Sequence, residues 1–343
     1  MEAALYPWQE ADWDRLQQLA ARLPHAILFH GAPGIGKAHF AEQFAQSMLC
    51  ESRDARGHAC NACASCTWFV QHNHPDYRRV RPEALEEDGG DSEEGESKAE
   101  SKTKAAKTPS KDIKIDQIRA LADFMNVSTH RSGKRVVLMY PAENLNGAAA
   151  NALLKTLEEP PPDTVFLLVS GSLDRLLPTI LSRCRKIALT QPDHASALAW
   201  LSEQGVAEAD SVLAEHGGAP LAALEHAAGR EEMLPFLQYL AAPGAELALK
   251  TAEKYQKSPL PQLVGIAQRW LYDLFSYKMT GVLRYYPRYQ KQFAALAART
   301  ETPALLAALK TAADKRAVAD HPLSGRLFVE DMLLDYAALF ARR

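Results

Sequence analysis

Short apolar runs alternate with amphipathic segments along the first half of the chain. Residues 37–49 place apolar side chains at helical spacing, and residues 150–159 (ANALLKTLEE) form a second helix, which three successive prolines end. The apolar runs between such segments predict buried strands. They stand at 25–30 (HAILFH), 136–140, 164–170 (TVFLLVS) and 187–190 (IALT). Strands that alternate with helices predict an α/β fold, a parallel sheet with helices on both faces.

Strand patterns stop at about Gln191, and helical patterns rich in Ala and Leu follow. Breaks at 229–235 (GREEMLP) and 241–246 (AAPGAE) divide this second half. The predicted domains are an α/β domain at 1–190, a small helical domain at 191–233 and an all-α domain at 234–343.

Residues 84–111 interrupt the first domain with a segment that is acidic first and basic afterwards. It has almost no large apolar side chains, so it cannot bury enough surface to offset the entropy of ordering it. We therefore predict a disordered insertion here.

Composition and charge exclude several classes of protein. The chain has 343 residues, 47% of them hydrophobic, and a net charge of −3, so no bulk positive field attracts nucleic acid. No apolar run is long enough to span a membrane, and the first residues are acidic where a signal peptide is basic. We expect a cytoplasmic protein, in which the five cysteines bind metal or stay as thiols.

The stretch HGAPGIGKA at 30–38 resembles a phosphate-binding loop. Gly31, Gly34, Gly36 and Lys37 supply the tight turns and the cation that such a loop uses, and the loop follows a predicted strand and opens a predicted helix. Ala38, however, stands where a hydroxyl would hold Mg²⁺. Binding of ATP or ADP by this loop is therefore doubtful.

A second loss falls at the end of the strand at 136–140. Tyr140 and Pro141 occupy the positions where two acids would bind the metal and orient water. Glu143 lies beyond the strand, out of register, and is a poor substitute. We predict that the chain does not hydrolyse ATP.

Four cysteines, at positions 50, 60, 63 and 66, fall within CESRDARGHACNACASC. Two overlapping C-x2-C pairs and a fourth thiol can close a tetrahedral thiolate shell, so Cys50, Cys60, Cys63 and Cys66 predict a structural zinc site. An iron–sulfur cluster and unligated thiols are the alternatives. The substitute ligands nearby are His58, His72 and His74.

Taken together, NALLKTLEEPP (151–161), LLPTILSRC (176–184), the phosphate loop and the cysteines resemble the AAA+ subunits of the bacterial DNA polymerase III clamp loader, and among these the delta-prime family. The resemblance extends to HPLSGRLFVEDMLLDY (321–336). It implies an AAA+ domain with a zinc module at 50–66, a helical lid domain and a helical collar domain.

The resemblance also implies roles for individual residues. Arg183, in Ser182-Arg183-Cys184, matches the arginine finger that reaches the ATP site of a neighbouring subunit. Leu221 stands where ATP-hydrolysing relatives have a sensing arginine. The implied partners are gamma/tau and delta subunits in a hetero-oligomer, with the sliding clamp and primed DNA reached through that complex.

Two other functions remain open from the sequence. One is an ATP-hydrolysing subunit of the same complex, which would need a metal-binding acid within 140–143. The other is a free-standing zinc protein that binds nucleic acid. It would use Arg78, Arg79 and Arg81, which follow the cysteines, as a local basic patch.

Overall fold

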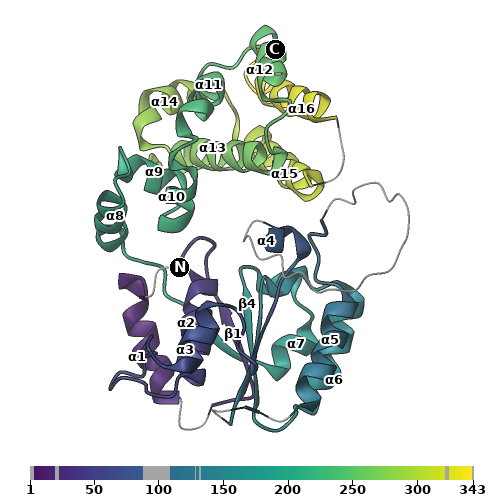
Figure 1. Ribbon diagram of the computed structural model, residues 1–343. Coiled ribbons are helices and arrows are strands. Elements are labelled where there is room, and N and C mark those ends of the chain that lie inside the picture. The colour runs from purple at the N-terminus through teal and green to yellow at the C-terminus, as the bar shows by residue number, and fades with distance from the viewer. Residues whose placement is uncertain are drawn as a thin grey trace. The chain divides into compact units, whose positions relative to one another are not determined.

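The computed structural model describes residues 4–19, 23–87, 109–127, 129–130, 133–320 and 324–341. Contacts divide the chain into two compact units, residues 1–192 and 193–343 (Figure 1). The first is an α/β unit and the second is helical. No helix in the described part is long and apolar enough to cross a membrane.

The first unit is built on a five-stranded sheet in the order β2-β3-β4-β1-β5, and every pair of neighbouring strands is parallel. The strands are β1 (Ala26–His30), β2 (Tyr77–Val80), β3 (Arg135–Met139), β4 (Thr164–Ser170) and β5 (Arg185–Ala188). The parallel sheet that the sequence predicted is confirmed.

Helices cover both faces of this sheet (Figure 1). In β1, Ile27 and Phe29 belong to one apolar core and Leu28 to the other, because successive side chains point to opposite faces. The first core includes side chains of α1 (Glu10–Leu19), α2 (Lys37–Leu49) and α3 (Ala64–Val70). The second includes side chains of α5 (Ile115–Asn126), α6 (Gly147–Glu158) and α7 (Pro178–Arg183).

Short elements connect these layers. They are the 3-10 helices η1 (Pro7–Gln9), η3 (Ala142–Asn144) and η4 (Leu173–Arg175), and the helix α4 (Glu83–Glu87). The predicted insertion at 84–111 lies mostly outside the described residues, since 88–108 are not described. Residues 84–87, which the prediction included, are helical in α4.

The structure corrects the strand predictions at two places. Strand β2 was not predicted, because its residues YRRV contain two arginines in place of an apolar run. Strands β3 and β5 begin and end one or two residues earlier than the predicted 136–140 and 187–190. Tyr140 therefore follows β3 and lies outside it.

The second unit consists of helices in the described residues: α8 (His194–Glu203), α9 (Ala209–Glu215), α10 (Pro220–Ala227), α11 (Arg230–Ala241), α12 (Ala245–Tyr255), α13 (Leu260–Thr280), η5 (Pro287–Tyr289), α14 (Gln290–Ala298), α15 (Thr302–Val318) and α16 (Gly325–Ala338). The division of this unit into a lid and a collar at residue 233 stays a prediction.

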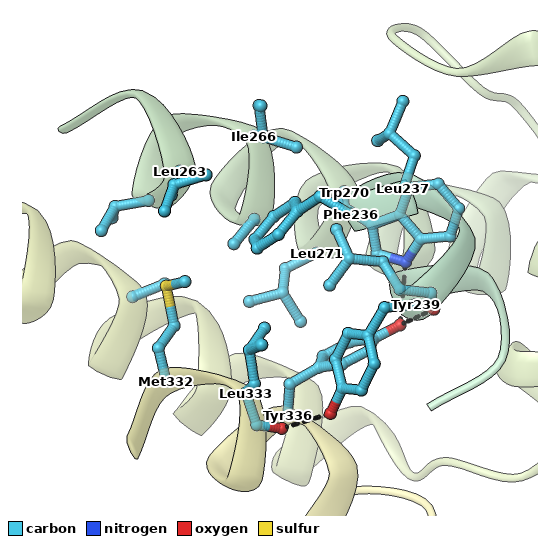
Figure 2. Close-up of a cluster of buried hydrophobic side chains, with 14 of the residues drawn as sticks. Phe236, Leu237, Tyr239, Leu263, Ile266, Trp270, Leu271, Met332, Leu333 and Tyr336 are labelled. Atoms are coloured by element: carbon cyan, nitrogen blue, oxygen red, sulfur yellow. Dashed lines mark hydrogen bonds between the residues drawn. The ribbon is translucent and has the colours of Figure 1, made fainter. Parts of the chain in front are cut away.

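One apolar core joins helices α11 to α16, and hydrogen bonds link several of its aromatic side chains (Figure 2). The fully buried Trp270 donates its Nε1–H to the hydroxyl of Tyr336 at 2.8 Å, which donates to the Leu240 carbonyl at 2.7 Å. Tyr239 donates to the Leu333 carbonyl at 2.8 Å. The polar groups of Trp270, Tyr336 and Tyr239 thus each have a partner, which lowers the cost of burying these three aromatic side chains.

Candidate functional site

The four predicted zinc ligands come together around the start of α3. Cys50 follows α2, Cys63 caps α3 and Cys66 lies within it, and the four sulfur atoms lie within 4.8 Å of one another. Backbone N–H groups of Cys60, Cys63 and Cys66 point at sulfur atoms of the cluster, at 3.2, 3.3 and 3.4 Å. Such donors stabilise thiolates, which are the metal-binding form of cysteine.

The thiols of the cluster titrate differently. Hydrogen bonds from the backbone of Ala62 and Cys63 lower the pKa of Cys60 to about 6. Burial raises the pKa of Cys50 and of Cys66. Because four adjacent thiolates repel one another, the chemistry of this donor set fits a soft divalent cation that neutralises them.

His74, a substitute ligand, has both ring nitrogens engaged elsewhere. The Asp76 N–H donates to Nδ1 at 3.0 Å, so the ring proton lies on Nε2, which donates to Ser65 Oγ at 2.7 Å. Ser65 in turn donates to the Leu49 carbonyl at 2.6 Å. His74 therefore holds the ends of α2 and α3 in place. Among the described residues, the set of converging ligand atoms contains only the four cysteines.

The phosphate loop is held by the chain's own N-terminal segment. Trp8 Nε1 donates to the Ile35 carbonyl at 2.9 Å, and Gln9 Nε2 donates to the Gly36 carbonyl at 2.9 Å. Gly36 has φ of +84°, and a Cβ there would lie 2.7 Å from the Tyr6 ring. Glycine is therefore required by conformation and by close packing together.

Lys37 lies at the first position of α2 and turns back onto the loop. Its Nζ donates to the Ala32 carbonyl at 2.7 Å. Burial lowers the pKa of Lys37, and the carboxylate of Glu143 opposes that shift. The neighbouring Ala38 offers no side-chain oxygen to a metal.

Tyr140, at the position of an expected acid, binds an acid instead. Its hydroxyl donates to Glu42 Oε1, on α2, at 3.1 Å, and Arg79 of β2 lies 3.7 Å from the same oxygen. Burial and Glu42 together raise the pKa of Tyr140, so the phenol stays protonated. The end of β3 is thus tied to α2 by a neutral group.

Arg183 is the last residue of α7. Its Nη1 donates to the Thr179 carbonyl at 2.9 Å, and its Nη2 donates to Glu158 Oε1, at the end of α6, at 2.5 Å. A third of the Arg183 side chain is exposed. The adjacent Cys184 is buried in the core, and burial raises its pKa to about 11, so this thiol is inert.

Comparisons with known proteins agree on one family. The family model described as "DNA polymerase III, delta subunit" matches residues 8–193. The DNA polymerase III subunit delta' of Pseudomonas aeruginosa is 36% identical over 81% of this chain and 79% of its own length. The chain belongs to the delta' family of DNA polymerase III subunits.

Other members of the delta' family are similar to it at comparable levels. The subunit of Escherichia coli is 32% identical over 74% of this chain and 72% of its own length. The subunit of Haemophilus influenzae is 34% identical over 65% of this chain and 61% of its own length. Among solved structures, a gamma subunit-related protein of Thermotoga maritima aligns with 96% of this chain and 99% of its own length, at 17% identity and a TM-score of 0.42. The resemblance that the motifs indicated is confirmed.

The sequence of this delta' family member did not predict several of the contacts made at its phosphate loop. Tyr6, Trp8 and Gln9 lie more than twenty residues from the loop they hold, and no motif marks them. Glu143 was judged out of register, yet its carboxylate reaches the loop region. The available signal was indirect: tryptophan side chains are highly buried on average, so Trp8 could be expected to pack against a core.

The basic patch expected of a nucleic-acid binder does not form as a surface. Arg81 is buried, and Arg79 points at Glu42. Arg78 is exposed, but its guanidinium lies over the Phe124 ring at 4.6 Å. The arginines after the cysteines are used mainly within the fold.

Proposed function

We propose that this chain acts as the delta' subunit of a clamp loader, without hydrolysing ATP itself. It joins gamma/tau and delta subunits in a ring that opens the sliding clamp and loads it onto primed DNA. Its chemical contribution is Arg183, which acts in trans at the ATP site of the adjoining subunit.

The position of Arg183 carries this proposal. Hydrogen bonds to the Thr179 carbonyl and to Glu158 fix the direction of the side chain, while a third of it remains exposed. A guanidinium that its neighbours orient and that stays partly exposed suits the γ-phosphate of a neighbouring nucleotide, whose charge it stabilises during phosphoryl transfer. Because α7 ends at this residue, no further helical turn covers it.

The chain's own phosphate loop supports the absence of hydrolysis. Ala38 offers no metal ligand, and Tyr140 is committed to Glu42. Leu221, near the start of α10, is apolar where hydrolysing relatives are expected to have an arginine. These three positions lack the groups that would bind Mg²⁺ and stabilise the transition state.

The same proposal includes a structural zinc ion and a three-domain organisation. Cys50, Cys60, Cys63 and Cys66 would hold the zinc, and four thiolates leave no open coordination position. Residues 191–233 would form the lid and residues 234–343 the collar that assembles with sister subunits. The lid and collar assignments within the helical second unit rest on the resemblance to the delta' family.

The decisive experiment replaces Arg183 in the assembled complex. Arg183→Ala is expected to slow single-turnover hydrolysis at the adjoining site about 10³-fold, because an arginine finger contributes at least that much. Arg185→Ala, an exposed arginine two residues away, is the matched control and should leave the rate unchanged. Gel filtration confirms that both variants assemble.

Two results would contradict the proposal. Equal rates for Arg183→Ala and wild type would remove Arg183 from the ATP site of the neighbour. Steady-state turnover by the isolated chain that Lys37→Ala abolishes would make this chain a motor in its own right.

A further inference from the structure

Glu143 places a carboxylate near Lys37 of the phosphate loop, an arrangement that the sequence does not predict. It lies in η3, four residues beyond the end of β3. Its Oε1 accepts the N–H of Gly171, the residue after β4, at 2.9 Å. Its Oε2 is buried and has no hydrogen-bond partner among the described residues.

Glu143 and Lys37 face the same point in the fold. A Cβ built on Gly171 would lie 3.2 Å from Glu143 Oε1 and 3.8 Å from Lys37 Nζ. The two groups are thus close neighbours, although Lys37 donates to the Ala32 carbonyl and not to the carboxylate. A side chain at position 171 would separate them.

The other ionisable groups around Lys37 are basic. His30, at the end of β1, has its pKa lowered by burial and by the charges of Lys186 and Lys37. Glu143 is the carboxylate that acts on Lys37. Among the described residues, Glu143 is thus the acid that acts on Lys37, beside Lys186 and a neutral histidine, and removing its charge would leave these groups with net positive charge.

We infer that Glu143 is a built-in counter-anion of Lys37, which keeps nucleotide phosphates out of the loop. A phosphate held by the loop N–H groups and Lys37 would lie close to a buried carboxylate oxygen that no donor neutralises. Like charges at such separations repel strongly where water is excluded. In an ATP-hydrolysing protein Mg²⁺ screens this repulsion, but Ala38 lacks the hydroxyl that helps to hold the metal.

This inference goes beyond the proposed role of Arg183 and does not depend on it. It explains why the loop would not bind nucleotide phosphates, and it assigns this effect to the side chain of Glu143. The losses at Ala38 and Tyr140 account only for the absence of hydrolysis. It also differs from the opposite assignment, in which Glu143 would be a metal ligand that supports binding of Mg²⁺ and nucleotide.

The test is equilibrium binding of ADP and of pyrophosphate to the full chain, with EDTA or with Mg²⁺. Glu143→Gln removes the charge but keeps an oxygen that can accept the Gly171 N–H, so the local fold is preserved. We expect the affinity for both probes in EDTA to rise at least about tenfold. Adding Lys37→Ala should abolish the gain.

The matched control is Glu42→Gln. Glu42 is an acid on the helix that Lys37 begins, and its carboxylate accepts a hydrogen bond from Tyr140. This variant should leave the affinity for ADP unchanged. An equal gain in both variants would show a general effect of charge and would overturn the specific role of Glu143.

Two further outcomes would overturn the inference. Unchanged affinity in Glu143→Gln, absence of detectable binding included, would show that the carboxylate does not exclude phosphate. Affinity that depends on Mg²⁺ in wild type and falls in Glu143→Gln would make Glu143 a metal ligand.

If Glu143→Gln fails to fold, Glu143→Ala and the reactivity of the Lys37 amine toward an acylating reagent serve instead. Loss of the counter-anion lowers the pKa of Lys37 and should raise that reactivity, and unchanged reactivity would contradict the inference.

Discussion

The phosphate loop and the end of α7 each present a cation at a helix terminus, but they are constructed in opposite ways. Lys37 bonds to its own loop, and the loop carbonyls are bound by Trp8 and Gln9. Arg183 is oriented by two neighbours and keeps a third of its side chain exposed. The first cation is used within the chain, and the second is available to another molecule.

If the proposed function holds, this difference explains how a subunit keeps the phosphate loop without hydrolysing ATP. The loop remains because its backbone is part of the core, where Ile35 is buried and Gly36 packs against Tyr6. Under the proposed function, the chemical contribution lies instead with Arg183, at a partly exposed position where it costs little stability. Under this view, variants at the two regions should differ sharply in their effects on folding.

Removal of metal from the cysteine cluster should have the largest effect on stability, since the segment between Cys50 and Cys60 packs against α1. Trp13 of α1 donates to the carbonyl of Arg56 at 3.0 Å and stacks on the ring of His58, with ring centroids 4.7 Å apart. Chelation should lower the free energy of unfolding of the first unit by several kcal/mol, because the binding free energy of a structural zinc ion contributes to folding. Urea unfolding before and after chelation measures this, and Cys63→Ser should reproduce it.

Metal analysis provides the check on that result. The chain as purified should contain about one zinc ion, which Cys63→Ser lacks. A chain that is free of metal and unfolds at the same urea concentration with or without chelator would contradict the zinc assignment.

Trp8→Ala should have the next largest effect. The side chain is 8% exposed, stacks on Tyr6 with ring centroids 5.0 Å apart, and donates to the Ile35 carbonyl. Its loss should cost about 3 kcal/mol in the free energy of unfolding. Trp8→Phe keeps an aromatic ring but loses the hydrogen bond and part of the buried surface, so it should cost less than Trp8→Ala and at least about 1 kcal/mol. Equal stability of Trp8→Ala and wild type would show that the N-terminal segment does not hold the loop.

Glu158→Ala should have the smallest effect on stability. Glu158 is half exposed and pairs with Arg183 at the surface, so its loss should change the free energy of unfolding by less than about 0.5 kcal/mol. In the assembled complex the same variant frees Arg183 to adopt other rotamers, so hydrolysis at the adjoining site should slow moderately. A loss of stability comparable to that of Trp8→Ala would mean that α7 is held by this ion pair.

The sequence was most informative where the relevant residues are close together along the chain. Cys50 to Cys66, the glycines before Lys37, and Ser182 to Cys184 form local motifs, and the structure brings the four cysteines together as their spacing predicts. The strands β1 and β4 were also found, since both faces of the sheet are covered and their residues are uniformly apolar. Strand β2 was missed because its arginines are accommodated by Glu42 and Phe124, from distant parts of the chain.

The sequence by itself determined the family, the order of the main elements and the positions of the loop and the cysteine cluster, and it singled out Arg183 as a candidate. These follow from local periodicity and from motifs whose chemistry depends on near neighbours. Only the tertiary structure decided that Trp8 and Gln9 bind the loop, that Tyr140 bonds to Glu42, and that Glu143 lies beside Lys37. Such contacts join residues that are far apart in sequence, so they depend on how strands and helices pack, and no local pattern specifies that packing.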